Sequence, residues 1–156
     1  MVIVQIPLGA RRLAYRTAFR WLTLVWLVRR PSKEGVKCLI VNGDRFLLVR
    51  HTYGDRVWDV PGGALKRGED PLAAAQREMR EELGIAGARW TPLGAVHGVV
   101  HHRRDTIHCF AAEPPSDALQ LDLGELETAR WFDPAQLPAD VAPYVGPVLS
   151  LRAQQR

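Results

Sequence analysis

The sequence predicts a mixed α/β (α+β) fold, because segments of strand character precede and follow one stretch of strong helix formers. The 156 residues suit a single domain of this kind. With 47% hydrophobic and 24% charged residues, the composition is that of a globular protein and excludes a wholly disordered chain. The two cysteines, Cys38 and Cys109, are too few for a disulfide framework, so we expect reduced core thiols in a cytoplasmic protein.

Residues 1–31 are predicted to form a basic amphipathic helix outside the main domain, which we expect to cover residues 32–156. Apolar side chains recur there at helical spacing: Leu13, Ala14, Ala18, Trp21, Leu22, Val25 and Val28. The uncharged stretch 21–28 is far shorter than the roughly 20 residues of a membrane span. The arginines around it and the following Pro31 are unlike a signal peptide. Two roles stay open: packing on the domain or on a second subunit in a homodimer, or peripheral contact of residues 10–30 with an anionic membrane.

Positive charge is concentrated in this first segment. Residues 1–37 hold eight basic groups and one acid, which gives +7. The remaining residues hold 13 basic and 16 acidic groups, which gives −3 and accounts for the total of +4. The main domain is therefore mildly acidic, and nucleic acid is not the expected partner.

Before the central helix, the pattern predicts three extended segments after a short polar linker at residues 32–35. The first two are joined by the hairpin signal Asn42–Gly43, and the third stops at Pro61. They cover residues 36–41, 45–51 and 57–60.

The central helix is predicted over residues 72–83, with Pro71 in its first turn and Gly84 as its stop signal. Further strands, a loop, a capped helical turn and a partly helical tail are expected after it. In that order, the strands cover 88–100 and 106–112, the loop 114–124, the last strand 128–132, the turn 133–137 and the tail 141–151.

Three carboxylates gather on the central helix. Glu78, Glu81 and Glu82 are spaced i, i+3 and i+4, so they lie on one side of the helix and repel each other. Taken alone, such a cluster is as well explained by a solvated helix face. A hard divalent cation would remove the repulsion, and the preceding Gly62–Gly63 pair lets backbone approach a ligand closely.

The residues around this cluster resemble the Nudix box, G-x5-E-x7-R-E-U-x-E-E-x-G-U, where U is apolar. The matching residues are Gly63, Glu69, Arg77, Glu78, Met79, Glu81, Glu82, Gly84 and Ile85. Met79 departs mildly from the Ile, Leu or Val more usual there. A chance match in a chain of this length is on the order of 10⁻⁸ to 10⁻⁷. The resemblance spans about residues 36–137 and implies a Nudix-type α/β/α sandwich with a mixed β-sheet, plus the extra N-terminal helix.

The resemblance also implies an enzyme and its site. It is expected to be a Mg²⁺-dependent pyrophosphohydrolase, with Mn²⁺ as a substitute, in which water attacks a phosphorus of a nucleoside diphosphate derivative. The implied metal ligands are Glu78, Glu81, Glu82 and the Gly62 carbonyl. Arg77 would orient them, paired with a glutamate such as Glu69. A further carboxylate before the last strand would be Glu125, favoured by position over Glu127. The general base stays open among Glu78, Glu81 and Glu125.

Substrate-binding residues are harder to derive from the sequence. Arg50 and Arg56 flank the expected pocket mouth and could grip a phosphate, although a solvated strand end explains them equally well. Trp58 could stack on a base, with core packing as the alternative. The histidines at 97, 101, 102 and 108 lack the cysteine spacing of a zinc site.

The substrate itself stays open. The proline that ADP-ribose-cleaving members often carry after the box is absent, and His101 lies near that position. We therefore expect a nucleoside triphosphate or a nucleotide sugar. The alternatives are a non-catalytic nucleotide sensor that docks through the N-terminal helix, and an enzyme that processes RNA 5′ ends, which only the basic first 37 residues support.

Overall fold

The computed structural model describes residues 6–29 and 32–155. Its elements follow in the order α1 (Leu8–Arg29), β1 (Ser32–Asn42), β2 (Arg45–His51), β3 (Trp58–Asp59), α2 (Pro71–Leu83), β4 (Arg89–Val100), β5 (Arg103–Glu113), β6 (Leu126–Phe132) and α3 (Val145–Ala153).

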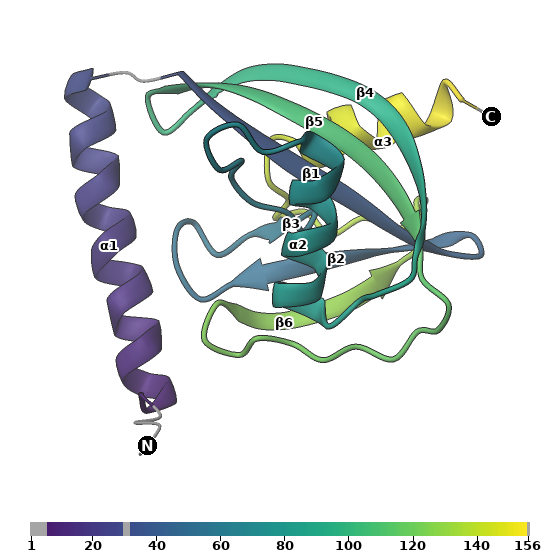
Figure 1. Cartoon of the computed structure of the whole chain (residues 1–156), viewed down its shortest axis with the longest axis horizontal. Helices are drawn as coiled ribbons and strands as arrows, with labels where there is room; N and C mark the ends of the chain where they lie inside the picture. The colour runs from purple at the N-terminus through teal and green to yellow at the C-terminus, as the bar shows by residue number, and fades with distance from the viewer. Residues whose placement is uncertain (1–5, 30–31, 156) are drawn as a thin grey trace.

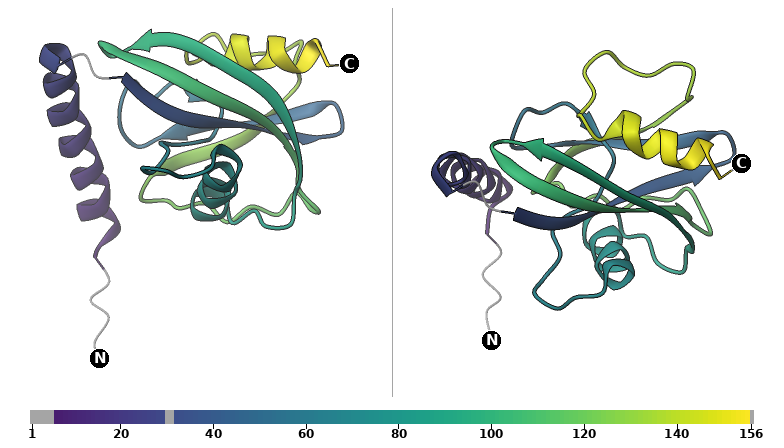
Figure 2. Two further views of the ribbon diagram at one scale, coloured as in Figure 1. Left: turned by 45° about the horizontal axis from the view of Figure 1, so that its top comes forward. Right: turned by 90° about the horizontal axis from the view of Figure 1, so that it is seen from above.

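A mixed sheet forms the middle layer, with α2 on one face and α3 on the other (Figure 1, Figure 2). The strand order is β3-β2-β1-β5-β4, and β6 also pairs with β2. β1 and β5 run parallel, whereas the other pairs are antiparallel. The predicted α/β/α sandwich with a mixed sheet is confirmed.

Successive side chains of a strand face opposite sides of the sheet, so each face of the sheet contributes to a hydrophobic core under one helix. In β2, Leu47 and Val49 pack in the cluster under α2, and Phe46 and Leu48 pack in the cluster under α3. The two cysteines divide in the same way. Cys38 lies on the α2 side and Cys109 on the α3 side, and both are free and buried.

The N-terminal helix α1 stands beside the sandwich, at one edge of its layers (Figure 1, Figure 2). Its inner side holds aromatic residues: Tyr15 stacks on Tyr53 with ring centroids 5.7 Å apart, and Phe19 packs edge-on against Trp26 and His101. No helix among the described residues is long and apolar enough to cross a membrane.

One predicted segment was wrong. Residues 32–35 are not a linker, because β1 begins at Ser32 and pairs with Arg104 of β5. Cross-strand pairing overrides the weak strand propensity of this polar stretch. The turn at residues 133–137 is closed by the Gln136 N–H, which donates to the Asp133 carbonyl at 2.9 Å, and it is capped by the Asp133 carboxylate, which accepts the Ala135 N–H at 2.8 Å. The expected helix end at Pro31 lies outside the described residues.

Candidate metal and nucleotide site

The helix α2 carries the carboxylates, and its ends are fixed by local chemistry. The Asp70 carboxylate accepts the Ala73 N–H at 3.0 Å as an N-cap, and Pro71 opens the first turn. Gly84 ends the helix in the left-handed conformation, at φ 67°. These caps fix where the helix begins and ends, and therefore the direction in which each glutamate projects from the helix axis.

Just before α2, a glycine pair lies against β1. The N–H of Val36 donates to the Gly63 carbonyl and the N–H of Cys38 to the Pro61 carbonyl, both at 2.8 Å. Alternation along this extended segment turns the intervening Gly62 carbonyl away from β1. Neither glycine has room for a side chain: a Cβ at Gly62 would lie 2.0 Å from the Val36 oxygen, and one at Gly63 would lie 2.4 Å from the carboxyl carbon of Glu78.

Arg77 connects the box residues. Its Nε and Nη2 donate to the two oxygens of Glu69 at 2.8 and 2.9 Å. Its Nη1 donates to Glu78 at 2.6 Å and, more loosely, to Glu81 at 3.3 Å. Hydrogen bonding from Arg77 lowers the pKa of Glu69 to about 2. The guanidinium therefore orients Glu78 while it remains paired with Glu69, which is ionised at neutral pH.

The three box glutamates lie at different depths. Glu82 is 1% exposed, among Ala75, Met79 and Leu83 on the buried face of α2. The Glu78 side chain is 13% exposed and that of Glu81 is 59% exposed. The i, i+3, i+4 spacing thus placed them on one side of the helix, but only Glu82 enters the core.

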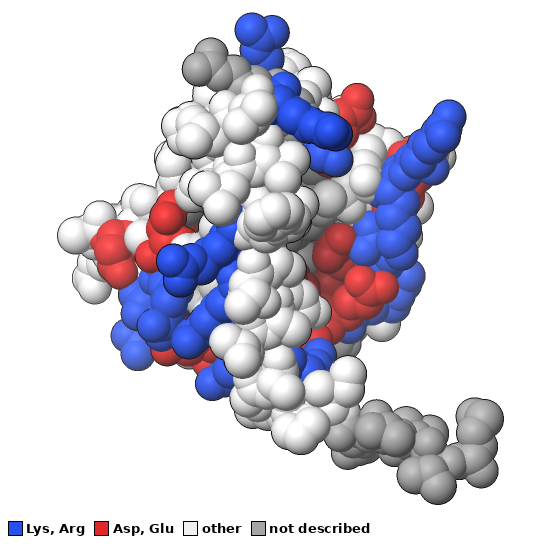
Figure 3. Space-filling model, turned by 90° about the vertical axis from the view of Figure 1, so that its left-hand side faces the viewer, with Lys and Arg blue, Asp and Glu red and all other residues white. Residues whose placement is uncertain are grey.

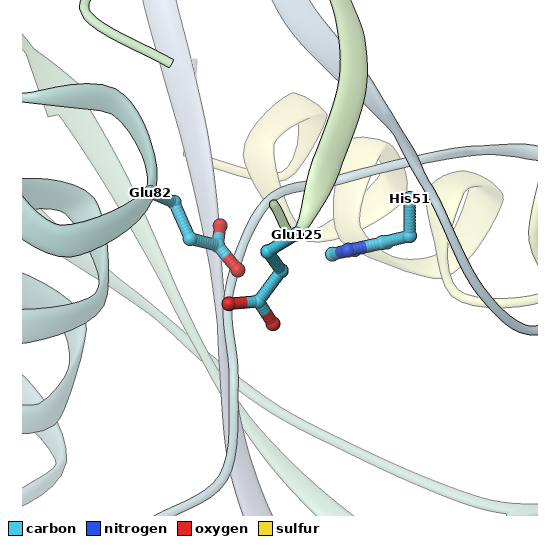
Figure 4. A group of neighbouring side chains, drawn as sticks. All are labelled: His51, Glu82 and Glu125. Carbon is cyan, nitrogen blue, oxygen red and sulfur yellow. The ribbon is translucent and has the colours of Figure 1, made fainter. Parts of the chain in front are cut away.

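Glu82 meets Glu125 and His51 inside the protein (Figure 4). Each offers one ligand atom, and the three atoms lie within 4.8 Å of one another. The carboxylates of Glu82 and Glu125 point toward each other, with the imidazole of His51 on the far side of Glu125 (Figure 4). Among the described residues this is the one group of three such side chains spaced for a metal ion.

The electrostatics of this group are unfavourable by themselves. Burial raises the pKa of Glu82 well above its ordinary value, and the charges of Glu125 and Glu78 raise it further. Burial also raises the pKa of Glu125, and it lowers the pKa of His51 to about 4, which leaves the ring neutral. The charge of Lys37 and the backbone N–H of Gly62 lower the pKa of Glu82, but neither oxygen of Glu82 has a hydrogen-bond partner of normal geometry in the described part of the chain.

A hard divalent cation fits this arrangement. Buried carboxylates without partners are costly, and they are rarely kept unless paired or bound to metal. Carboxylate oxygens are the preferred ligands of Mg²⁺, and a neutral imidazole suits Mn²⁺ as well. The residues that could hold the cation are therefore Glu82, Glu125 and His51, with Glu78 beside them against Gly63.

Glu125 is positioned by a strand irregularity and by a tyrosine. In the β2–β6 pair, Arg50 faces Thr128 but His51 faces Leu126, so β6 bulges at Glu127. Beyond the bulge, the N–H of Thr52 donates to the Glu125 carbonyl at 2.8 Å. The Tyr53 hydroxyl then donates to the Glu125 carboxylate at 2.8 Å.

The same loop is anchored to α1. Arg11 donates to both carboxylate oxygens of Asp122 at 2.9 and 2.8 Å, and Arg12 donates to the Leu123 carbonyl at 3.0 Å. Arg16 donates to the Thr52 carbonyl at 2.9 Å. The N-terminal helix thus secures the segment that carries Glu125, a role the sequence did not indicate.

A cavity of about 570 Å³ lies between α1 and the sheet. His51, Gly62 and Gly63 are among its lining residues, so it lies beside the carboxylate group, although Glu82 and Glu125 do not themselves line it. Phe19 and Trp26 of α1 line it as well, and Lys37 and Asp59, which pair at 2.6 Å, add a polar patch. Its size and mixed lining suit a nucleotide-sized ligand.

The structure does not bring every predicted residue to this site. Trp58 is 6% exposed and packs edge-on against Phe132, and Arg50 lies over its ring at 4.7 Å, on the α3 side of the sheet. Arg56 lines the cavity, and its guanidinium is bound to Glu127 at 2.7 Å. Strand alternation accounts for Arg50, which faces the same side as Leu48.

The sequence reasoning missed His51 as a member of the carboxylate group, and Tyr53 as the donor to Glu125. One signal was available: His51 continues the odd-numbered face of β2 after Leu47 and Val49, which is the face under the box helix.

Together, the fold and the site define an α/β/α sandwich with a group of buried carboxylates, suited to a divalent cation, beside a nucleotide-sized cavity. The model of the NUDIX domain matches residues 31–151, most of the chain. The chain therefore belongs to the Nudix family.

Curated relatives carry several activities. An ADP-ribose pyrophosphatase of Mycobacterium tuberculosis is 49% identical over 45 residues, which are 28% of this chain and 22% of that protein. An RNA pyrophosphohydrolase of Bartonella bacilliformis is 35% identical over 40% of this chain and 42% of its own length. A Bacillus subtilis protein provisionally named 8-oxo-dGTP diphosphatase is 29% identical over 70% and 72%. The chain thus spans less than half of the first two relatives.

Solved structures agree on the fold. A MutT NUDIX hydrolase from Burkholderia pseudomallei has a TM-score of 0.71 and 26% identity, over 77% of this chain and 97% of that one. The NUDIX domain of Shewanella oneidensis NrtR, solved with ADP ribose, has a TM-score of 0.65 over 81% and 88%. At 15% identity, that second likeness shows the fold alone.

Proposed function

We propose that the chain is a Mg²⁺-dependent pyrophosphohydrolase, with Mn²⁺ as a substitute, that cleaves a phosphoanhydride of a nucleoside di- or triphosphate derivative. The observation that carries the proposal is the buried Glu82 carboxylate, which has no hydrogen-bond partner of normal geometry among the described residues and faces Glu125 beside a nucleotide-sized cavity. Membership of a family whose relatives are named pyrophosphatases and diphosphatases supports it.

Each residue has a distinct role in this proposal. Glu78, Glu81, Glu82, Glu125 and the Gly62 carbonyl are the candidate ligands named from the sequence, and His51 joins them on the geometry. When bound, the cation neutralises charge on the phosphate oxygens and makes phosphorus a better electrophile.

The remaining roles in the proposed reaction belong to side chains of the protein. Arg77 holds the Glu78 carboxylate in place through its 2.6 Å bond. The residue that takes a proton from the attacking water stays open among Glu78, Glu81 and Glu125. The hydrogen bond from the Tyr53 hydroxyl holds the Glu125 carboxylate in its position facing Glu82. The helix α1 forms one wall of the cavity.

Within the family's substrates, a nucleoside triphosphate or a nucleotide sugar remains our expectation. The RNA 5′-end alternative has relatives of that name in its favour. Against it, three of the α1 arginines, Arg11, Arg12 and Arg16, are bonded to the protein's own loops and are not left for a phosphate backbone. A cytoplasmic location and a homodimer stay predictions.

The test is hydrolysis of a nucleotide panel by the purified full-length chain with Mg²⁺, with Mn²⁺ or with EDTA. The panel contains ordinary and 8-oxo nucleoside triphosphates, ADP-ribose, nucleotide sugars, dinucleoside polyphosphates and 5′-triphosphate RNA. Products are identified by mass after reaction in ¹⁸O-water, since attack on phosphorus places the label in a phosphate product.

We expect metal-dependent cleavage that Glu82→Gln abolishes and the matched variant Glu113→Gln retains, because Glu113 pairs with Arg89 at the outer end of β5. Folded protein that binds Mn²⁺ but cleaves no compound of the panel would overturn the proposal and favour a nucleotide sensor.

A further inference from the structure

The outer side of α1 carries an apolar band that no described residue covers. It consists of Leu13, Trp21, Leu24, Leu27 and Val28, which are between 48% and 82% exposed and are called the outer stripe here. At 3.6 residues per turn these positions fall within about 120° of the helix surface and extend over about 22 Å. The inner aromatic residues Tyr15 and Phe19 lie on the opposite side, against Tyr53. The helix therefore packs on the domain through its inner side, and the outer stripe takes no part in this packing.

Charge on this helix is of one sign. Its sequence contains five arginines and no acidic residue. Arg11, Arg12 and Arg16 are used by the domain, whereas Arg20 and Arg29 make no hydrogen bond or ion pair with any described residue. Arg20 directly precedes Trp21 and lies one turn before Leu24, about 20° inside one border of the outer stripe. Figure 3 shows basic side chains beside the uncharged band of α1 on this face.

We propose that the outer stripe of α1 docks the protein on an anionic phospholipid surface, with the helix lying in the plane of the interface. An apolar face with Trp and Leu, edged by arginines, binds at the headgroup boundary by combining apolar burial with attraction to anionic lipids. Trp favours this depth because its ring is amphipathic. The apolar part of the described helix is too short to span a bilayer, so the proposed orientation is along the membrane surface.

Charge complementarity favours lipid over a second copy of the chain. Pairing two α1 helices through the outer stripe would bring arginines together with no carboxylate of α1 between them. Lipid phosphates supply the missing negative charge. Docking would also set the cavity beside the membrane surface, since its wall is the inner side of the same helix.

The experiment is flotation of the full-length protein with vesicles of phosphatidylcholine, alone or mixed with phosphatidylglycerol. We expect binding to the mixed vesicles only, weakened by added salt. The double variant Trp21→Ser/Leu24→Ser should lower the partition coefficient on the order of 100-fold. Arg20→Gln and Arg29→Gln should each lower it about fivefold.

A matched control removes an exposed apolar side chain elsewhere. Leu137 is 40% exposed on the loop after β6, and Leu137→Ser should float as the unchanged protein does. Thermal unfolding of each variant confirms that it is folded. Absence of flotation, or equal flotation of the double variant, would overturn the proposal. So would a dimer in light scattering that the double variant disperses while vesicles bind neither form.

Discussion

Replacing Glu82 by glutamine should make the metal-free protein more stable and should reduce the stabilisation that added metal provides. In the native protein the Glu82 carboxylate is 1% exposed, has no hydrogen-bond partner of normal geometry among the described residues and faces Glu125. Leaving such a group unsatisfied costs about 1–3 kcal/mol. The glutamine has the same shape, carries no charge and can donate its N–H to Glu125.

The size of the effect follows from these values. For a chain of this length, 1 kcal/mol corresponds to about 2–4 °C in Tm, so we expect Glu82→Gln to unfold roughly 2–10 °C higher in EDTA. In the unchanged protein, metal at 100 times its Kd adds about 2.7 kcal/mol. If the variant binds 100-fold more weakly, the same concentration adds only about 0.4 kcal/mol.

The assay is differential scanning fluorimetry, with calorimetry for confirmation, across a Mn²⁺ series and in EDTA. Glu113→Gln is the control, because its carboxylate is 38% exposed and pairs with Arg89. The reasoning is refuted if Glu82→Gln unfolds at a lower temperature in EDTA and keeps the full Mn²⁺-induced shift. That result would mean that Glu82 is satisfied within the fold and holds no metal.

Three further predictions concern its neighbours. Gly63→Ala would place a methyl group 2.4 Å from the carboxyl carbon of Glu78, so Mn²⁺ affinity by isothermal titration should fall at least about tenfold, with little change in Tm. Tyr53→Phe removes the donor to Glu125, so Tm should fall by about 2–4 °C and Mn²⁺ affinity severalfold. Because pairing lowers the pKa of Glu69 to about 2, its contribution to stability is complete above its unfolded pKa of about 4.3 and is lost as the pH falls toward 2. The stability difference from Glu69→Gln, measured by urea unfolding, should therefore shrink as the pH falls below about 4.

Each of these has a control or a contrary outcome. Gly146→Ala, in α3, places a methyl group where nothing lies within 4 Å and should leave Mn²⁺ binding unchanged. Unchanged Mn²⁺ affinity in Tyr53→Phe would show that Glu125 needs no help from that hydroxyl. A stability difference for Glu69→Gln that stays constant down to pH 2 would contradict the paired carboxylate.

The sequence alone determined the local parts of this protein. The start of α2 at Pro71, its end at Gly84 and the hairpin at Asn42–Gly43 depend on residues a few positions apart, and all appear in the structure. The box pattern identified the family for the same reason, since its fixed residues lie on one helix and the loop before it.

Only the tertiary structure decided how deep each carboxylate lies and what it meets. Helical spacing fixes the side of α2 on which a glutamate projects, but burial depends on the strands and loops packed opposite. That packing buries Glu82 beside His51 and leaves Glu81 exposed. It also sends Trp58 to the α3 side, away from the cavity. Contacts between segments far apart in the chain, such as Arg11 with Asp122, have no local signal, so the placement of α1 against the site followed only from the folded chain.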